Sequence, residues 1–168
     1  MTTLVFRDGV MAADTQATDY NTTYQVQKVW RLPDGGVAGL CGDASKGYAG
    51  VKWLAEGEVG DPPSIKGAYI VIARPDGSLW LAEDHFPAFP VMDKMIAHGC
   101  GRDFARAALA EGKSAVEAVF AAIKHDLMTS APVMSLRVVS IEFPEAEFHY
   151  SAKPSVTETK KRARKARP

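Results

Sequence analysis

Three pairs of short apolar segments, each joined by turn-forming residues, dominate the first half of the chain. Thr3–Arg7 and Val10–Asp14 flank Asp8-Gly9, a dipeptide typical of tight β-hairpin turns. Residues 26–32 and 37–41 flank Pro33-Asp34-Gly35-Gly36, and residues 68–73 and 79–82 flank Pro75-Asp76-Gly77. The pattern predicts three antiparallel hairpins.

The apolar residues of these segments do not alternate with polar ones. Leu4, Val5 and Phe6 are consecutive. Because successive side chains of a strand point to opposite faces, such a strand is expected to be covered on both sides.

Helical periodicity dominates the later part of the chain. We predict helices over residues 44–56, after Gly101, and after Ser114, which forms a capping box with Glu117. Phe104, Ala108 and Leu109 are the apolar positions of the second helix, and Val116, Val119, Phe120, Ile123 and Leu127 form the stripe of the third, which Pro132 is expected to end. Closing strands are predicted over residues 134–141 and 146–150. The order indicates an α+β fold of stacked sheets flanked by helices.

Composition excludes several classes of protein. With 168 residues, 46% hydrophobic and 24% charged, the chain has the make-up of one globular domain. No run of about 18 apolar residues predicts a membrane span, and the N-terminus lacks a secretory signal. Two cysteines provide no disulfide framework, so we expect a cytoplasmic protein. The histidines and cysteines lack metal-ligand spacing, and no cofactor is expected.

The balanced net charge hides a basic tail. Residues 153–168 hold seven Lys or Arg residues and a single acidic one, Glu158, so the tail carries +6 and the rest of the chain −6. We therefore predict a folded domain over residues 1–152 and a disordered tail over 153–168. The alternative for the tail is docking onto nucleic acid or an acidic partner.

Thr2 is a candidate nucleophile. Removal of Met1 before a small residue would leave Thr2 as the first residue, with its own α-amine beside its hydroxyl. A hydroxyl needs a base, and an α-amine with a pKa of about 7.7–8.0 is well suited to that role. Many chains begin Met-Thr without any such function.

Lys28 and Asp14 form a candidate charged pair. Lys28 lies in the predicted strand Val26-Gln27-Lys28-Val29-Trp30, whose alternation would place Val26, Lys28 and Trp30 on one face. A lysine there either extends its amine into water or is buried with a counter-ion. Asp14, at the end of the second strand, is the candidate partner, or simply caps a turn.

The stretch TTLVFRDGVMAADTQAT resembles the start of proteasome β-type subunits and of the bacterial peptidase HslV. Three further stretches resemble later parts of the same family in the same order: AGLCGDAS, HGCGRDFARAAL and HDLMTSAPV. The resemblance covers residues 2 to about 140. It implies the four-layer αββα sandwich of N-terminal nucleophile (Ntn) hydrolases.

The resemblance also implies roles for individual residues. Thr2 would be the nucleophile, Lys28 would lower the pKa of its hydroxyl and amine, and Asp14 would hold Lys28. The Gly42 N–H would stabilise the oxyanion, and Asp126 would orient the amine. Thr129 and Cys100 occupy positions where the family usually has serine, and a thiol is a poor hydrogen-bonding substitute. The implied substrate-binding residues are Ala17, Thr18, Val26, Trp30 and Leu40.

The function implied by the resemblance is peptide-bond hydrolysis through an acyl-enzyme at Thr2. It further implies stacked rings of subunits that enclose a chamber, and an ATP-dependent (AAA+) unfoldase that threads unfolded protein into it. Two alternatives remain open from the residues: an Ntn amidase acting on a small amide, and a proteasome-like structural subunit that retains Met1 and does not cut.

Overall fold

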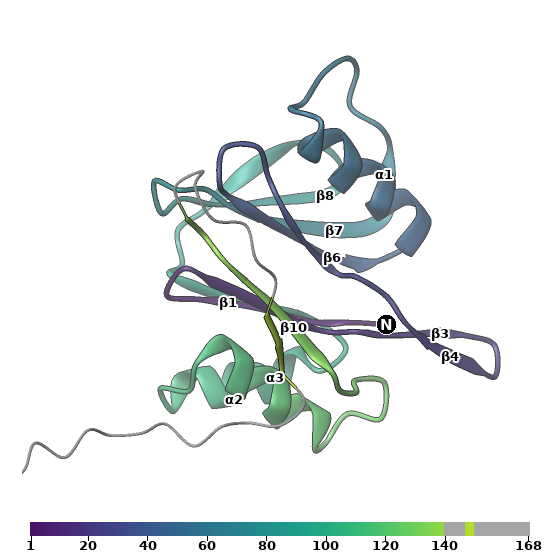
Figure 1. Cartoon of the computed structure of the whole chain (residues 1–168), viewed down its shortest axis with the longest axis vertical. Coiled ribbons are helices and arrows are strands. Elements are labelled where there is room, and N and C mark those ends of the chain that lie inside the picture. Colours follow the sequence, from purple (N-terminus) through teal and green to yellow (C-terminus); the bar gives the residue numbers. More distant parts are fainter. Residues whose placement is uncertain (140–146, 150–168) are drawn as a thin grey trace, which may run out of the picture.

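Two antiparallel sheets lie face to face in the computed structural model, which describes residues 1–139 and 147–149 (Figure 1). The first sheet has the strand order β11-β10-β2-β1-β9. Its strands are β1 (Thr3–Arg7), β2 (Val10–Asp14), β9 (Met95–Gly99), β10 (Val133–Arg137) and β11 (Glu147–His149). The second sheet has the order β5-β6-β7-β8. Its strands are β5 (Val29–Arg31), β6 (Val37–Gly42), β7 (Ile65–Ala73) and β8 (Leu79–Val91).

Helices cover the outer faces of both sheets. Helix α1 (Ala44–Ala55) packs on the second sheet, whereas α2 (Arg102–Ala110) and α3 (Ala115–Ile123) pack on the first (Figure 1). One apolar cluster fills each of the three boundaries between these layers. Leu4 and Phe6 point into the cluster between the sheets, and Val5 points into the cluster against α2 and α3. The predicted two-sided burial of β1 is therefore confirmed, and the mixture of helices and antiparallel sheets is compatible with the α+β prediction.

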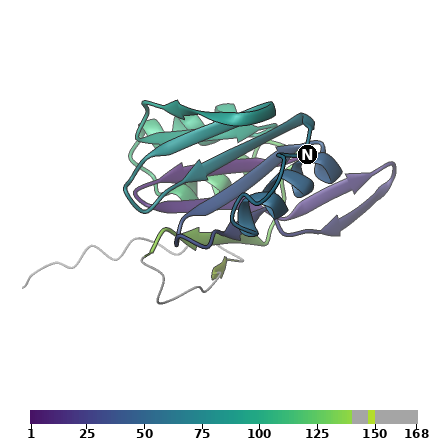
Figure 2. The same cartoon turned by 90° about the horizontal axis from the view of Figure 1, so that it is seen from above.

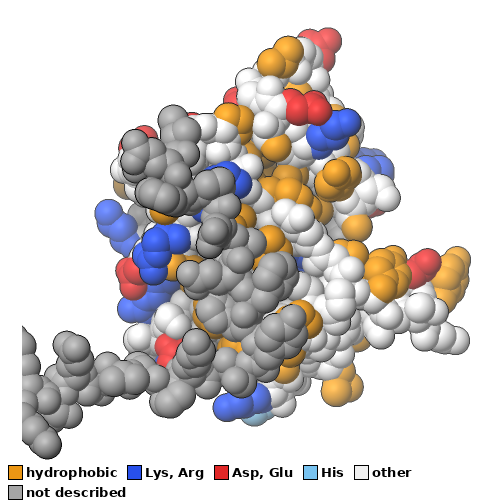
Figure 3. Space-filling model, viewed as in Figure 1, with side chains coloured by type: hydrophobic (Ala, Val, Ile, Leu, Met, Phe, Trp, Pro, Cys, Tyr) orange, Lys and Arg blue, Asp and Glu red, His pale blue; other side chains and the backbone are white. Residues whose placement is uncertain are grey.

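A third, two-stranded unit projects from the body as an arm. It consists of β3 (Gln16–Asp19) and β4 (Thr22–Gln25), which pair only with each other among the described strands. Figure 2 shows the arm extending beyond the sheets. Hydrophobic side chains gather on the arm in Figure 3. Two tyrosines of the arm are exposed, Tyr20 by 96% and Tyr24 by 49%. The sequence patterns did not predict this hairpin, because its strands contribute almost nothing to a core.

The three predicted hairpins are present, with differences at their ends. Asp8 and Gly9 both have positive φ, 50° and 77°, as a two-residue turn between β1 and β2 requires. In the second hairpin, the first strand covers only Val29–Arg31, so the prediction that Val26, Lys28 and Trp30 share a strand face is wrong. Residues 26–28 instead connect two units, because the Val26 N–H binds the Thr15 carbonyl next to the β3–β4 arm, whereas the Lys28 carbonyl accepts from the Leu40 N–H of β6. Strand β9 was not predicted.

The predicted helices are present, but the third is shorter than expected. It ends at Ile123 because the N–H groups of His125 and Asp126 both bind the Ala122 carbonyl, which closes the last turn. Leu127 therefore lies outside the helix and is 93% exposed, contrary to its predicted place in the apolar stripe. Phe104 of α2 is also 42% exposed, since it packs on His125 rather than in the core.

Both predicted closing strands are present, and the first ends earlier than predicted, at Arg137. Strand β10 covers Val133–Arg137 and β11 covers Glu147–His149. The remainder of these predicted segments beyond residue 139, and the predicted tail over residues 153–168, lie outside the described residues. No helix in the described ranges is long and apolar enough to cross a membrane.

The capping box at the start of α3 is formed as predicted. The Ser114 hydroxyl accepts from the Glu117 N–H, and the Glu117 carboxylate accepts from the Ser114 N–H at 2.9 Å. These bonds lower the pKa of Glu117, so its stabilising contribution is present above the ordinary pKa of 4.5 and is lost as pH falls through the lowered value.

We expect Ser114→Ala to lower the free energy of unfolding by about 1 kcal/mol, because it leaves a helix N–H without its partner. Urea denaturation at neutral pH measures this change. Ser64→Ala, at an exposed loop position, is the matched control and should change stability little. Equal stabilities of the two variants would contradict the capping role.

Candidate active site

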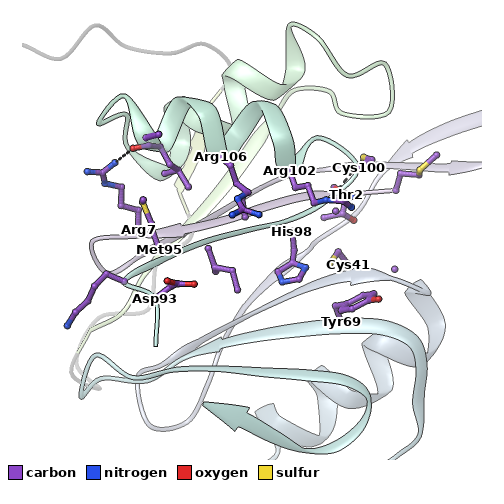
Figure 4. Close-up of a pocket in the computed structure, with 18 of the residues that line it drawn as sticks. Thr2, Arg7, Cys41, Tyr69, Asp93, Met95, His98, Cys100, Arg102 and Arg106 are labelled. Atoms are coloured by element: carbon purple, nitrogen blue, oxygen red, sulfur yellow. Dashed lines mark hydrogen bonds between the residues drawn. The ribbon is translucent and has the colours of Figure 1, made fainter. Parts of the chain in front are cut away.

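Thr2 enters β1 at the open end of the space between the two sheets (Figure 4). Its carbonyl accepts hydrogen bonds from the Cys100 N–H at 2.8 Å and from the Cys100 thiol at 3.2 Å. The chain at Gly99 passes so close that a Cβ there would overlap the Thr2 carbonyl oxygen, and its φ is +95°. Glycine at position 99 is therefore required to hold Thr2 in this place.

Lys28 and Asp14 form a buried ion pair beside Thr2. The Lys28 ammonium lies 3.0 Å from one Asp14 carboxylate oxygen and 3.1 Å from the other. It also donates to the Gln16 carbonyl at 2.6 Å and to the Met1 carbonyl at 2.8 Å. The Asp14 carboxylate accepts further bonds from the backbone N–H groups of Thr3 and Gln16. Every charge of the pair is thus satisfied, as burial demands.

Burial shifts both members of the pair toward their neutral forms. It lowers the pKa of Lys28, against the opposing charge of Asp14, and it raises the pKa of Asp14, against the Lys28 charge and the two backbone bonds. Since the Met1 carbonyl carbon is bonded to the Thr2 nitrogen, the contact with Met1 places the Lys28 ammonium next to the main chain of Thr2.

A chain of hydroxyl contacts connects the start of β1 to the loop after α3. The Thr3 hydroxyl lies 2.7 Å from the Thr129 hydroxyl, which donates to the Asp126 carboxylate at 2.5 Å. The Gly101 N–H also donates to the Thr3 hydroxyl. Although burial raises the pKa of Asp126, hydrogen bonds from Cys100, Thr129 and the Met128 N–H outweigh it and hold that pKa below its usual value. Asp126 therefore carries a negative charge at neutral pH.

The two cysteines have different surroundings. Burial raises the pKa of Cys41 to about 12, so its thiol is not a nucleophile at neutral pH. Cys100 contacts Thr2, Thr129 and Met128, and its pKa is raised by burial and by its bond to Asp126. The thiol at position 100 thus joins the network between Thr2 and Asp126, over sulfur–oxygen distances of 3.2 to 4.0 Å.

Gly42, the predicted oxyanion donor, is the last residue of β6, and it lines the same cleft as Thr2. Its φ is +93°, and a Cβ at this position would overlap the Gly67 carbonyl oxygen. The neighbouring Asp43 N–H binds that same carbonyl at 2.8 Å, and Asp43 then caps α1 through its bond to the Lys46 N–H. The backbone at Gly42 is therefore fixed between a strand and a helix N-terminus.

The predicted substrate-binding residues lie in two groups. Trp30 and Leu40 belong to the cluster between the second sheet and α1, where Trp30 faces Tyr48 with ring centroids 6.2 Å apart. Ala17 and Thr18 lie on β3 of the arm, and Val26 follows β4. Their roles in binding stay predictions.

A cleft of about 1060 Å³ opens beside Thr2. Besides Thr2, Cys41, Gly42 and Cys100, it is lined by all of β9 and by residues of α2. The side chains of Tyr69 and His98 stack within it, with ring centroids 5.6 Å apart (Figure 4). None of the five predicted substrate-binding residues lines this cleft.

No group of three or more His, Cys, Asp or Glu residues able to hold a metal ion occurs in the part of the chain that the structure describes.

The fold is shared with a solved structure. No protein-family model matches the chain, and no curated protein matches it either. The structure of BPH from Thiobacillus denitrificans in complex with epoxomicin superposes with a TM-score of 0.60 at 19% sequence identity. The match covers 82% of this chain and 98% of that one, so the two proteins have the same fold over nearly the whole of BPH.

Sequence patterns alone missed three features of the site. The Thr3 hydroxyl joins the Thr2 end to Asp126, yet Thr3 stands in an apolar strand with nothing to distinguish it. The Gln16 backbone binds both members of the ion pair. The cleft itself depends on how β9 and α2 pack. The two glycines of Gly99-Cys100-Gly101 were the sequence feature that could have indicated this close packing. A Cβ at Gly99 would overlap the Thr2 carbonyl oxygen, and one at Gly101 would overlap the Thr3 hydroxyl.

Proposed function

We propose that this protein is an N-terminal-threonine peptidase with the αββα fold of the proteasome β-type and HslV-like Ntn hydrolases. The observation that carries the proposal is the buried Lys28 ammonium, bound to Asp14 and touching the main chain directly before Thr2. Burying an ion pair costs desolvation free energy, and ionisable groups whose pKa values are shifted by burial and a charged partner cluster at active sites.

Removal of Met1 would convert the Thr2 nitrogen into a free α-amine. The hydrogen bond from the Lys28 ammonium to the Met1 carbonyl would then be lost, and the ammonium group would be free to interact with Thr2. The positive charge of Lys28 would favour the alkoxide form of the Thr2 hydroxyl and lower the pKa of the amine, so that the amine can act as base at neutral pH. Asp126, through Thr129 and Cys100, would orient the same end of the chain.

The proposed reaction has two stages. The Thr2 hydroxyl oxygen attacks the carbonyl carbon of the scissile peptide bond, and its proton passes through the α-amine to the leaving nitrogen. The Gly42 N–H stabilises the negative oxygen of the tetrahedral intermediate. Water then attacks the resulting ester, the amine takes its proton, and the Thr2 hydroxyl is regenerated as the substrate's carboxylic acid leaves.

The cleft favours an extended peptide over a small amide as the substrate. Its volume of about 1060 Å³ lies just above the range of about 300–1,000 Å³ that suits small ligands, and its lining includes every residue of β9. An amidase acting on a small amide would instead be expected to have an enclosed pocket.

We propose the chambered arrangement of the family for the assembly, with subunits in stacked rings and an AAA+ unfoldase delivering unfolded protein. The exposed tyrosines of the β3–β4 arm support self-association, because large aromatic side chains are enriched in interfaces.

Hydrolysis of a fluorogenic peptide by the purified protein tests the proposed activity. We expect turnover by the protein from which Met1 has been removed, reduced turnover by Thr2→Ser, and none by Thr2→Ala. Turnover by Thr2→Ala equal to that of the native protein would rule out Thr2 as the nucleophile.

A further inference from the structure

The cleft beside Thr2 is elongated, and Thr2 lies at one of its ends. Figure 4 shows Thr2 and Cys100 at one end, Arg106 and His98 in the middle, and Arg7 and Asp93 at the other end. Along the cleft, β9 pairs with β1 from Gly99 opposite Thr3 to Met95 opposite Arg7. Four residue steps of a strand span about 13 Å, which is room for about four residues of an extended peptide.

Strand β9 presents a free edge to this space. It is the last strand of its sheet, paired on one side with β1 and with no other described strand on the opposite side. All five of its residues line the cleft, although alternate side chains of a strand point to opposite faces. Consecutive residues of a strand can all line one cleft when the cleft runs along the edge of the strand. At such an edge the strand's backbone N–H and C=O groups can pair with an extended peptide.

The cleft is electropositive. Its lining includes four cationic residues, Arg7, Lys94, Arg102 and Arg106, and two carboxylates, Asp8 and Asp93. Arg7 and Asp8 are already engaged, because Arg7 binds Asp8 at 3.1 Å and the carbonyls of Leu109 and Lys113. The remaining charges therefore comprise three cations and Asp93.

Two of the remaining cations lie one helical turn apart on α2. The pKa of His98 is lowered by burial, then by the charge of Arg102 and less strongly by that of Arg106, whereas the charge of Glu83 raises it. Arg102 has one ion-pair partner, the adjacent and exposed Asp103 at 3.7 Å, and Arg106 makes no hydrogen bond or ion pair with any residue that the structure describes. In Figure 4 both arginines lie between α2 and His98. Their guanidinium groups are available to a ligand.

The position of the cleft relative to Thr2 indicates which half of a substrate enters it. The residues predicted to bind the substrate side chain before the scissile bond lie on the arm, after β4, and against α1, and none of them lines the cleft. A peptide that crosses Thr2 from that side would continue into the cleft with the residues after the scissile bond.

We propose that the cleft binds the segment that follows the scissile bond and that Arg106 and Arg102 select a carboxylate in it. This inference rests on the proposed peptidase function. The carboxylate belongs either to an Asp or Glu side chain or to the C-terminus of a short substrate. A guanidinium group binds either one through charge-assisted hydrogen bonds.

The effect is expected to be moderate, because both arginines are accessible to water. Exposed ion pairs contribute up to about 1 kcal/mol, which corresponds to about a fivefold preference.

The first test measures binding without catalysis, in the Thr2→Ala protein. Calorimetry compares two pairs of tetrapeptides: one with Glu against the same peptide with Gln, and one with a C-terminal acid against its amide. We expect the acidic member of at least one pair to bind about fivefold more tightly. The pair that shows the difference identifies the source of the carboxylate.

The double variant Arg102→Gln with Arg106→Gln should remove the preference, whereas Lys52→Gln, which removes an exposed cation on α1, should retain it. Equal dissociation constants within both pairs, or a preference that survives the double arginine variant, would overturn the proposal.

The second test places the carboxylate relative to the scissile bond. In the protein with native Thr2, the compared peptides are identical up to the cleaved bond. Those carrying after it the carboxylate that the first test identified, Glu or the C-terminal acid, should be hydrolysed about fivefold faster than those carrying its amide, Gln or the C-terminal amide. A carboxylate preference only before the bond would overturn the assignment. Epoxomicin should label Thr2 equally in the double arginine variant and in the protein with native arginines. If the native protein were not labelled, the proposed nucleophile would be wrong, whereas the proposal for the cleft concerns only the carboxylate preference.

Discussion

Replacing Lys28 with Met is expected to reduce peptide hydrolysis by at least about 10²-fold, since it removes the charge proposed to activate Thr2. The same change leaves the Asp14 carboxylate buried without its counter-ion, which costs about 3–5 kcal/mol of stability. Reduced hydrolysis by Lys28→Met alone could therefore result either from lost activation of Thr2 or from unfolding.

The double variant Lys28→Met with Asp14→Asn separates these effects. It removes both charges, and we expect it to be more stable than Lys28→Met alone while remaining inactive. Turnover and urea denaturation of the same samples measure the two quantities. An active double variant would show that the ion pair only stabilises the fold.

The pH dependence of peptide hydrolysis by the native protein gives an independent test of the role proposed for Lys28. The proposed activation requires the charged form of Lys28, and burial lowers its pKa below the ordinary value of 10.5. We therefore expect kcat/KM to decline on the alkaline side at a pH below 10.5, as Lys28 loses its proton. The Lys28→Met protein should lack this alkaline limb.

Gly42→Ala is expected to lower kcat by about 10²–10³-fold, because a Cβ would push the backbone away from the Gly67 carbonyl and displace the N–H proposed to bind the oxyanion. Gly77→Ala is the matched control. Gly77 has a similar φ of +85°, but a Cβ there would meet nothing within 4 Å.

Both glycine variants should lose about 1 kcal/mol of stability from the positive φ alone. Gly77→Ala should nevertheless keep full activity. Equal kcat values for the two variants and the native protein would remove Gly42 from the mechanism.

The sequence predicted best those features that depend on a few neighbouring residues. The Asp8-Gly9 turn and the Ser114–Glu117 capping box are local arrangements with specific residue requirements, and both are present. The pairing of Asp14 with Lys28 was a hypothesis about two residues 14 positions apart, and the structure brings them together. It could be formulated because a buried lysine demands a carboxylate.

Other features depend on packing that no local pattern records. Strand β9, Met95–Gly99, begins with an exposed Met95 and has only Ala97 buried, so its apolar signal is weak. The β3–β4 arm has no core-facing side at all. The hydroxyls of Thr3 and Thr129 are in contact although these residues are 126 positions apart, because the loop between α3 and β10 packs beside the start of β1.

The central claim is that Thr2, freed of Met1, is a covalent nucleophile. An intact-mass spectrum of the full-length protein, recorded before and after incubation with epoxomicin, tests it most directly, because that compound is bound in the BPH structure of the same fold. We predict loss of the Met1 mass and one adduct per chain, absent from Thr2→Ala. Met1 retained with no adduct, or an adduct that persists in Thr2→Ala, would contradict the account.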